Sequence, residues 1–219
     1  MALDTWMLDE LVAGAAPMLR LYRWRRPTLS LGRHQQRLEP HWLELASAGV
    51  IDLVRRPTGG RAVLHAGDLT YALVCRPTSG KRLEAYAQAC RWLQVAFEAL
   101  GQPLQLGRTA PRQAQGRSSC FASATAADLV HGCGAKRIGS AQLWRGPALL
   151  QHGSVLLEPP VDLWRQVFAE DPPLLPPLGC SAVELEAVLC DAAERSLCGG
   201  PLRVQPLTAT ERHHLGVAI

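Results

Sequence analysis

One stretch of the sequence, Arg55-Arg56-Pro57-Thr58-Gly59-Gly60-Arg61-Ala62-Val63-Leu64-His65, indicates both the fold and the functional site. It joins two short segments of strand character through a proline and a glycine pair, which together signal a tight turn. The glycines let backbone N–H groups face a ligand at close range. Consecutive residues on a strand point to opposite faces, so at most one of Arg55 and Arg56 is expected to face that ligand. Taken alone, the stretch is explained equally well by a simple turn with solvated arginines.

A second group of motifs lies downstream and complements the first. It consists of Lys136-Arg137-Ile138-Gly139-Ser140-Ala141-Gln142 and Gln151-His152-Gly153-Ser154, with Ser119-Cys120-Phe121 before them. A reactive thiol requires partial exposure and a nearby positive charge, and Lys136 is one predicted hairpin away from Cys120. Lys81 and Lys136 are the only lysines in the chain, which argues against a casual surface role for Lys136. The competing interpretation is an ordinary loop cysteine and a strand-end lysine whose ammonium reaches solvent.

Two histidines and a second cysteine remain ambiguous from sequence alone. Each of His65 and His152, taken singly, is better explained as a hydrogen-bonded structural histidine than as a ligand or base. Cys133, inside a Gly-Cys-Gly turn, is a second exposed thiol candidate. A hairpin tip is poorly placed to converge on the glycine turn, so Cys133 ranks below Cys120.

The order of predicted elements defines the fold class. Helical periodicity is predicted over residues 2–13, 40–47, 83–100, 161–168, 182–197 and 208–215. Strands are predicted over residues 19–31 (with a turn near 26–27), 51–56, 62–64, 69–76, 104–106, 128–131, 136–144 and 148–157. Residues 109–119 are polar and lack periodicity, which predicts a loop. Strands that cluster in the middle, without a regular β-α-β alternation, predict an α+β fold with a mixed, mostly antiparallel sheet covered by helices.

Composition and charge limit the domain count and the class of partner. A chain of 219 residues is long enough for one well-filled core. We expect a catalytic domain over residues 1–170, with a proline-rich connector and C-terminal helical segment (171–219) packed on the same domain. The net charge of +4 suits an acidic protein partner, whereas the absence of basic runs interleaved with aromatic residues argues against nucleic acid.

The cysteines and the apolar pattern suggest the compartment. Seven cysteines without a CxxC pair argue against a zinc site and against a disulfide framework. The sequence contains neither a signal peptide nor an apolar stretch long enough to span a bilayer. These features predict a cytoplasmic protein with no metal site and no membrane partner.

Together the motifs resemble the lipoate-protein ligase A and octanoyltransferase superfamily. The resemblance rests on a basic pair, Thr58-Gly59-Gly60, His65, the Lys136-x-x-Gly-Ser-Ala-Gln motif and His152-Gly153, in this order. It runs from the N-terminal helix to about residue 157 and continues more weakly beyond. It implies the catalytic-domain fold shared by biotin- and lipoate-protein ligases.

Two departures from the ligases indicate the branch of that family. Adenylate-forming ligases usually have three consecutive glycines where this chain has Gly59-Gly60-Arg61. They usually follow the histidine with Asp and Gly-Asn, where this chain has Ala66-Gly67-Asp68. These departures, and Cys120 in the loop before the lysine motif, resemble the cysteine-dependent octanoyltransferases of the ligase-like type. In that group the lysine corresponding to Lys136 favours the thiolate form of the cysteine.

The resemblance implies a complete reaction. Cys120 would take an octanoyl group from octanoyl-acyl carrier protein as a thioester and pass it to a lysine of an apo lipoyl domain, either the glycine cleavage H protein or a 2-oxoacid dehydrogenase E2. No cofactor is implied, and a monomer is expected. The implied catalytic residues are Cys120 and Lys136. The implied substrate-binding residues are Arg55, Arg56, Thr58, Gly59, Gly60, Arg61, Ala62, Val63, His65, Gly139, Ser140, Ala141, Gln142, His152 and Gly153.

Three other functions are compatible with the same motifs. An ATP-dependent lipoate-protein ligase would not need Cys120. A lipoyl amidotransferase, which moves the acyl group between lipoyl domains, would use the same thiol chemistry. A non-catalytic protein that carries acylated lipoyl domains would acquire no acyl adduct of its own.

Overall fold

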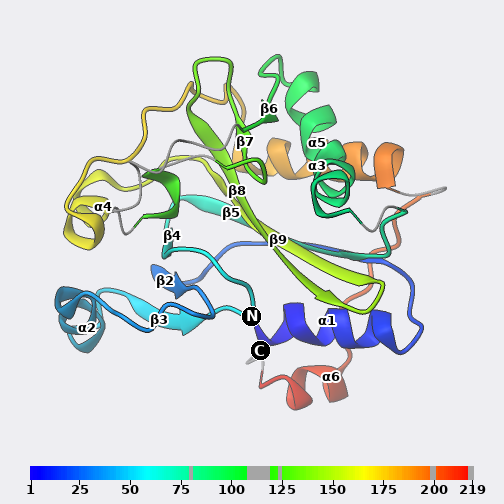
Figure 1. Ribbon diagram of the computed structural model, residues 1–219, viewed down its shortest axis with the longest axis horizontal. Helices are drawn as coiled ribbons and strands as arrows, with labels where there is room; N and C mark the ends of the chain where they lie inside the picture. The colour runs from blue at the N-terminus through cyan, green and yellow to red at the C-terminus, as the bar shows by residue number, and fades with distance from the viewer. Residues whose placement is uncertain (79–80, 108–118, 123–124, 198–200, 217–219) are drawn as a thin grey trace.

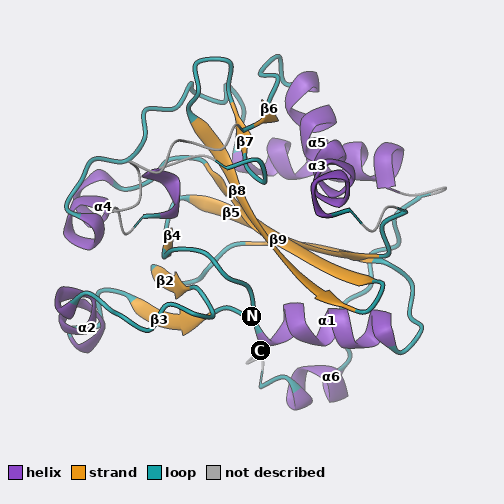
Figure 2. Cartoon of the chain, in the orientation of Figure 1, coloured by secondary structure: helices purple, strands orange, loops and turns teal. Residues whose placement is uncertain are grey.

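A computed structural model of the chain describes residues 1–78, 81–107, 119–122, 125–197 and 201–216. Its main element is a six-stranded sheet with the order β1-β5-β9-β8-β7-β6, in which every neighbouring pair is antiparallel. The strands are β1 (Met18–Tyr22), β5 (Asp68–Cys75), β6 (Gln105–Leu106), β7 (Leu129–Val130), β8 (Lys136–Arg145) and β9 (Ala148–Leu156). Helices lie around this sheet (Figures 1 and 2).

The alternation of side chains along β5 places a different helix layer on each face of the sheet. Leu69, Tyr71 and Leu73 belong to a core with α3 (Arg82–Ala99) and α5 (Ala182–Leu197). The intervening Ala72 and Val74 pack with Met7, Leu8 and Leu11 of α1 (Ala2–Val12). Because both faces are covered, β5 is buried along almost its whole length.

The α1-facing side of β9 changes from apolar to polar and back again. Ala148 and Leu150 belong to the α1 core, and Leu156 belongs to a second core described below. Between them on the same side are His152 and Ser154, both buried. A polar strip therefore interrupts the apolar face where the two cores meet, and the candidate site is built there.

A second, three-stranded sheet adjoins the first, with the order β3-β2-β4. Strand β2 (Thr28–Leu31) pairs in parallel with β3 (Asp52–Arg55) and antiparallel with β4 (Val63–His65). Its core includes aromatic side chains of α2 (Pro40–Ser47) and α4 (Val161–Phe168). The fully buried Trp42 indole donates a hydrogen bond of 2.6 Å to the Val167 carbonyl, which joins α2 to α4.

The predicted fold class is confirmed, with one correction. The α+β class, the mostly antiparallel sheet and the hairpin around Cys133 agree with the structure. The segment predicted as one bent strand over residues 19–31 instead forms β1 and β2, which lie in different sheets. Pro27, which has no N–H to donate, and the exposed Arg25 and Arg26 separate the two strands. Of the loop predicted over 109–119, only Ser119 lies within the described residues.

Helix α5 and the proline-rich segment before it contact the rest of the chain. Helix α5 shares a core with α3, and the fully buried Arg137 donates a hydrogen bond to the Pro176 carbonyl of the proline-rich segment. A short helix, α6 (Ala209–His214), begins with a capping box formed by Thr208 and Glu211. Within the described ranges, no helix combines the length and apolar character required to cross a bilayer.

Candidate active site

Cys120 and Lys136 are in direct contact. Cys120 opens a short 3₁₀ turn (Cys120–Ala122) and is partly exposed, whereas the Lys136 side chain is only 3% exposed. The Lys136 Nζ atom lies 3.4 Å from the Cys120 Sγ atom and 2.8 Å from the Cys120 carbonyl oxygen. One ammonium group therefore both anchors the turn and places a positive charge beside the thiol.

The turn that bears the thiol is attached to the strand after the glycine pair. Ser119 forms an isolated parallel bridge with Ala62. The Cys120 N–H donates a hydrogen bond of 2.9 Å to the Ala62 carbonyl. This connection brings together two motifs that lie far apart in the sequence.

Gly139 explains why the Lys136 side chain can reach the thiol along its own strand. A Cβ atom at Gly139 would lie 3.0 Å from Lys136 Cε and 3.6 Å from the Phe121 ring. The Phe121 ring lies under the ammonium, with 5.1 Å between Nζ and the ring centroid. Glycine at this position thus leaves room for the lysine between the strand and the aromatic ring.

The thiol lines a small cavity of about 60 Å³ at the junction of the two sheets. Most of its lining comes from the glycine turn, β4, β8 and β9. The lining residues are Met1, Ser30, Arg56, Gly59, Gly60, Val63, His65, Thr70, Cys120, Gly139, Ser140, Ala141, His152, Gly153 and Ser154.

The two arginines of the basic pair point in different directions, as strand geometry predicts. Arg55 is exposed, and its guanidinium donates to the carbonyls of Gly32 and Gln35, at 2.8 and 2.9 Å. Arg56 is buried and donates to the carbonyls of Ser30, Gly59 and Arg61. Burial lowers the pKa of Arg56, while the nearby Cys120 acts in the opposite direction. Arg56 thus braces the glycine turn from inside and places a second cation in the cavity.

The backbone at Gly32 closely approaches the backbone of the glycine turn at Gly60 and so fixes the position of that turn. A Cβ atom at Gly32 would collide with the carbonyl oxygen of Gly60 and lie 2.9 Å from its carbonyl carbon. The Arg33 N–H also donates a hydrogen bond of 2.8 Å to the Thr58 carbonyl. Gly60 itself has a φ of 101°, a conformation that favours glycine.

His152 forms the centre of a buried chain of hydrogen bonds. Its Nδ1 atom lies 3.1 Å from Asp4 Oδ2, and its Nε2 atom lies 2.7 Å from Thr58 Oγ1. Burial lowers the pKa of His152 despite the opposing effect of Asp4. Burial alone would raise the pKa of Asp4, but His152 and the nearby Arg20 outweigh it, and the pKa is lowered. A neutral imidazole beside an ionised carboxylate therefore holds the glycine turn to α1.

This arrangement predicts that the free energy of unfolding decreases as the pH is lowered below about 6.5. The unfolded chain binds a proton at a histidine near pH 6.5, whereas the folded chain, with its lowered His152 pKa, does so only at lower pH. The unfolded state is therefore favoured as pH falls, by at most ~1.4 kcal/mol per pH unit for one group. His131, whose pKa burial also lowers, contributes with the same sign. Urea unfolding at pH 7.5, 6.5 and 5.5 measures the slope, and His152→Gln should flatten it. An unfolding free energy that stayed constant across this range would contradict the assignment.

His65, which also lines the cavity, belongs to a second chain of hydrogen bonds. Its Nδ1 atom lies 2.8 Å from Asp68 Oδ2 and its Nε2 atom lies 2.9 Å from Ser30 Oγ. The Trp24 ring stacks on the imidazole with 4.7 Å between centroids. Ser30 and Asp68 are buried, so this network is a closed support for the cavity wall.

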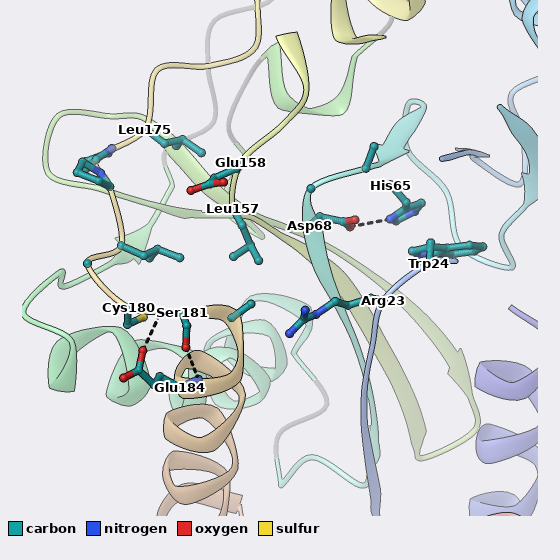
Figure 3. A pocket seen from close by; sticks show the side chains of 17 residues that line it. Arg23, Trp24, His65, Asp68, Leu157, Glu158, Leu175, Cys180, Ser181 and Glu184 are labelled. Atoms are coloured by element: carbon teal, nitrogen blue, oxygen red, sulfur yellow. Dashed lines mark hydrogen bonds and ion pairs between the residues drawn. The ribbon is translucent and has the colours of Figure 1, made fainter. Parts of the chain in front are cut away.

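A larger groove of about 930 Å³ lies beyond the Trp24–His65 stack (Figure 3). Its other wall is the proline-rich segment and the start of α5, including Leu175, Cys180 and Glu184. The dashed pairs in Figure 3, His65 with Asp68 and Ser181 with Glu184, are internal to the walls. Cys120 and Lys136 do not line this groove, so the candidate chemistry belongs to the smaller cavity.

Burial distinguishes other cysteines from Cys120. It raises the pKa of Cys75 to about 11 and that of Cys90 to about 12, so both remain protonated thiols at neutral pH. Cys133 is exposed in the turn between β7 and β8. Among the residues the structure describes, no three histidine, cysteine or acidic side chains are grouped to hold a metal ion.

Comparison with known proteins identifies the family. A family model described as the lipoyl protein ligase A/B catalytic domain matches residues 1–173. The chain belongs to this family. Members similar to it include the octanoyltransferase LipM of Carboxydothermus hydrogenoformans, 39% identical over 168 residues, which cover 74% of this chain and 61% of that protein. The octanoyltransferase LipM of Symbiobacterium thermophilum is 39% identical over 173 residues, which cover 73% of this chain and 63% of that protein. The match thus spans a little over three-fifths of the length of these relatives.

Solved structures of lipoyl protein ligases share the fold. A lipoate-protein ligase A bound with ATP superposes with a TM-score of 0.77 at 20% identity, covering 98% of this chain and 86% of that one. A bipartite lipoate protein ligase from Thermoplasma acidophilum gives a TM-score of 0.68 at 19% identity, covering 97% and 85%. At such low identity the likeness concerns the fold alone.

The predicted site residues of this lipoyl protein ligase family member fall into two groups. Most line the cavity or touch its thiol, as described above. The others support the cavity from behind or lie outside it: Arg55, Thr58, Arg61, Ala62 and Gln142. Gln142, for example, donates to the Gln151 side chain at 2.8 Å, away from the thiol.

Sequence reasoning missed the buried acids that hold the site together. These are Asp4, Asp68 and Asp128, which pair with His152, His65 and Lys136. Each lies within or beside an apolar segment, where a single acidic residue is the available signal. Which side chain each acid contacts depends on how distant segments pack together, which was not part of the prediction.

Proposed function

We propose that this protein is an octanoyltransferase that moves an octanoyl group from acyl carrier protein to a lysine of an apo lipoyl domain through a Cys120 thioester. The observation that carries the proposal is the contact of 3.4 Å between Lys136 Nζ and Cys120 Sγ in a cavity with a glycine turn. Similarity to proteins named octanoyltransferase LipM supports the same reaction. A cysteine and a lysine in contact are the parts that thioester exchange requires.

The first half of the reaction transfers the acyl group to the enzyme. The Cys120 thiolate attacks the carbonyl carbon of the octanoyl thioester, a new C–S bond forms, and the bond to the carrier sulfur breaks. The departing carrier thiolate takes a proton. The Lys136 ammonium favours the attacking thiolate and the buried Arg56 adds a second positive charge nearby.

The second half produces the amide. The neutral ε-amine of the acceptor lysine attacks the Cys120 thioester, the nitrogen loses a proton, and the C–S bond breaks to restore the Cys120 thiolate. An amide is more stable than a thioester, so no ATP is required.

The glycine pair is the best source of donors for the oxyanion of each step. The Cys120 N–H is already bonded to the Ala62 carbonyl, and the Phe121 N–H donates to Ser119 Oγ at 3.1 Å. The N–H groups of Gly59 and Gly60 have no acceptor in the described part of the chain and belong to residues that line the cavity. We assign them to the oxyanion, with Val63 and the Gly139–Ala141 segment lining the acyl chain.

The remaining assignments follow from this reaction. The donor is octanoyl-acyl carrier protein, and the acceptor is the glycine cleavage H protein or a 2-oxoacid dehydrogenase E2. We propose a cytoplasmic monomer that uses no cofactor. Residues 1–170 form its catalytic domain, and residues 171–219 pack on that domain, as the shared core of α3 and α5 suggests.

A transfer assay tests the proposal against its alternatives. The protein is mixed with octanoyl-acyl carrier protein and apo lipoyl domain without ATP, and acceptor mass is followed. Octanoylation of the acceptor is expected. Acylation that appears only with free octanoate or lipoate plus ATP would make the protein a ligase. Transfer from a lipoylated domain, but not from the carrier, would make it a lipoyl amidotransferase. If the acceptor is acylated with none of these donors, the protein would be a non-catalytic carrier of acylated lipoyl domains.

A further inference from the structure

Asp128 contacts the same Lys136 ammonium that contacts the thiol. Its Oδ2 atom lies 3.1 Å from Lys136 Nζ, and the side chains of both residues are 3% exposed. The three groups Asp128, Lys136 and Cys120 thus form a continuous series of contacts, from carboxylate to ammonium to sulfur. The sequence motifs include the last two members only.

The carboxylate is itself held in place by neighbouring donors. Oδ2 accepts from the Thr125 N–H at 2.6 Å and from Thr125 Oγ1 at 2.9 Å. Oδ1 faces the Ser140 N–H at 3.4 Å. These bonds fix the orientation of the carboxylate, so it is a rigid partner for the lysine.

Strand register explains why a residue eight positions before Lys136 meets its side chain. In the hairpin of β7 and β8, Val130 lies opposite Lys136. Asp128 directly precedes β7, so the hairpin brings it close to Lys136. The register shifts between Leu129 and Val130, an irregularity of the kind that re-aims side chains beside active sites.

Two electrostatic effects of Asp128 on the thiol oppose each other. Its negative charge alone would disfavour a thiolate nearby. Its pairing with Lys136, however, holds the buried ammonium in place beside the sulfur. Lys136 touches the sulfur directly, whereas Asp128 reaches it only through the lysine. We expect the second effect to dominate, because the direct effect of the Asp128 charge on the sulfur weakens with distance.

We infer that Asp128 is a positioning residue of the acyl-transfer site, which holds the Lys136 ammonium over Cys120 and thereby maintains the reactive thiolate. The catalytic meaning of this inference rests on the proposed function. The contacts between Asp128, Lys136 and Cys120 do not depend on which acyl donor is used. It assigns a third participant to the cysteine–lysine pair and states the direction of its effect.

The test follows the pH dependence of Cys120 alkylation in Asp128→Asn. Iodoacetamide labelling of the full-length protein is quantified on the Cys120 peptide by mass spectrometry. The midpoint of the labelling rate should move upward by about one pH unit or more, in the same direction as in Lys136→Met. Acyl transfer at pH 7 should fall by about tenfold and recover as pH is raised, because the thiolate then forms without help. A merely structural role would not give recovery with pH.

Matched variants complete the test. Asp162→Asn removes the same charge from a side chain that is 92% exposed and should leave the midpoint unchanged. If Asp128→Asn does not fold, Thr125→Val removes one hydrogen bond to the carboxylate and should give a smaller upward shift. A midpoint that stays or moves downward in the folded variant would overturn the inference. Because labelling needs no acyl donor, this result is separate from any failure of octanoyl transfer.

Discussion

Cys120→Ala is expected to abolish formation of an acyl adduct on the protein. Intact-protein mass spectrometry after mixing with octanoyl-acyl carrier protein, without ATP, should give an octanoyl adduct on the wild type only. Addition of apo lipoyl domain should remove this adduct. Transfer to the acceptor should fall by at least about 1000-fold in the variant, because loss of the nucleophile removes both chemical steps.

The other cysteines provide the control for this result. Cys133 is exposed but lies outside the cavity lining, so Cys133→Ala should retain the adduct and full transfer. Full transfer by Cys120→Ala from the carrier donor would show that the thioester mechanism is wrong. An adduct that formed on Cys133 instead would move the nucleophile to the hairpin turn.

Gly32→Ala should cause the largest loss of stability among the substitutions considered. Its Cβ atom would collide with the Gly60 carbonyl oxygen, and both groups belong to the backbone, so no flexible side chain can yield. Overpacking of this kind costs about 3 kcal/mol or more, which corresponds to a fall in Tm on the order of 10 °C. Because relief requires the glycine turn to shift, transfer should be lost even below the new Tm.

Gly59→Ala is the matched control for backbone crowding. A Cβ atom at Gly59 meets no heavy atom within 4 Å, and Gly59 is not among the residues with positive φ. Its Tm should stay close to that of the wild type, within about 0.5 kcal/mol in unfolding free energy. Differential scanning fluorimetry of both variants gives the comparison. A Gly32→Ala protein as stable as Gly59→Ala would mean that the two backbone segments do not approach closely.

The candidate site was only partly predictable from the sequence. The glycine turn, Cys120 and Lys136 were each named from local motifs, and the structure brings them together through the Ala62–Ser119 bridge. The roles of individual residues were less accessible. Arg55 and Arg56 are adjacent in sequence, but only packing determines that Arg56 is the one inside. Asp4 contacts His152 although 148 positions separate them in the sequence, a pairing that no local pattern encodes.

The fold was also only partly predictable, as residues 19–31 show: they form two strands that lie in different sheets. Alternation and the content of Leu, Tyr, Trp and Thr predict strand structure with a turn near Pro27, and a strand is present on each side of it. Whether the second part continues the first sheet or begins another depends on partners that lie elsewhere in the chain. Strand β1 pairs with β5, while β2 pairs with β3 and β4.

By itself, the sequence determined the elements, the α+β class, the family and the cysteine–lysine pair, because periodicity and motif spacing are properties of neighbouring residues. Only the tertiary structure decided which side chain each buried acid contacts, which arginine faces the cavity and where the two sheets divide. Those outcomes depend on contacts between segments far apart in the chain, and the requirement that every buried charge find a partner is met only when the segments have packed together.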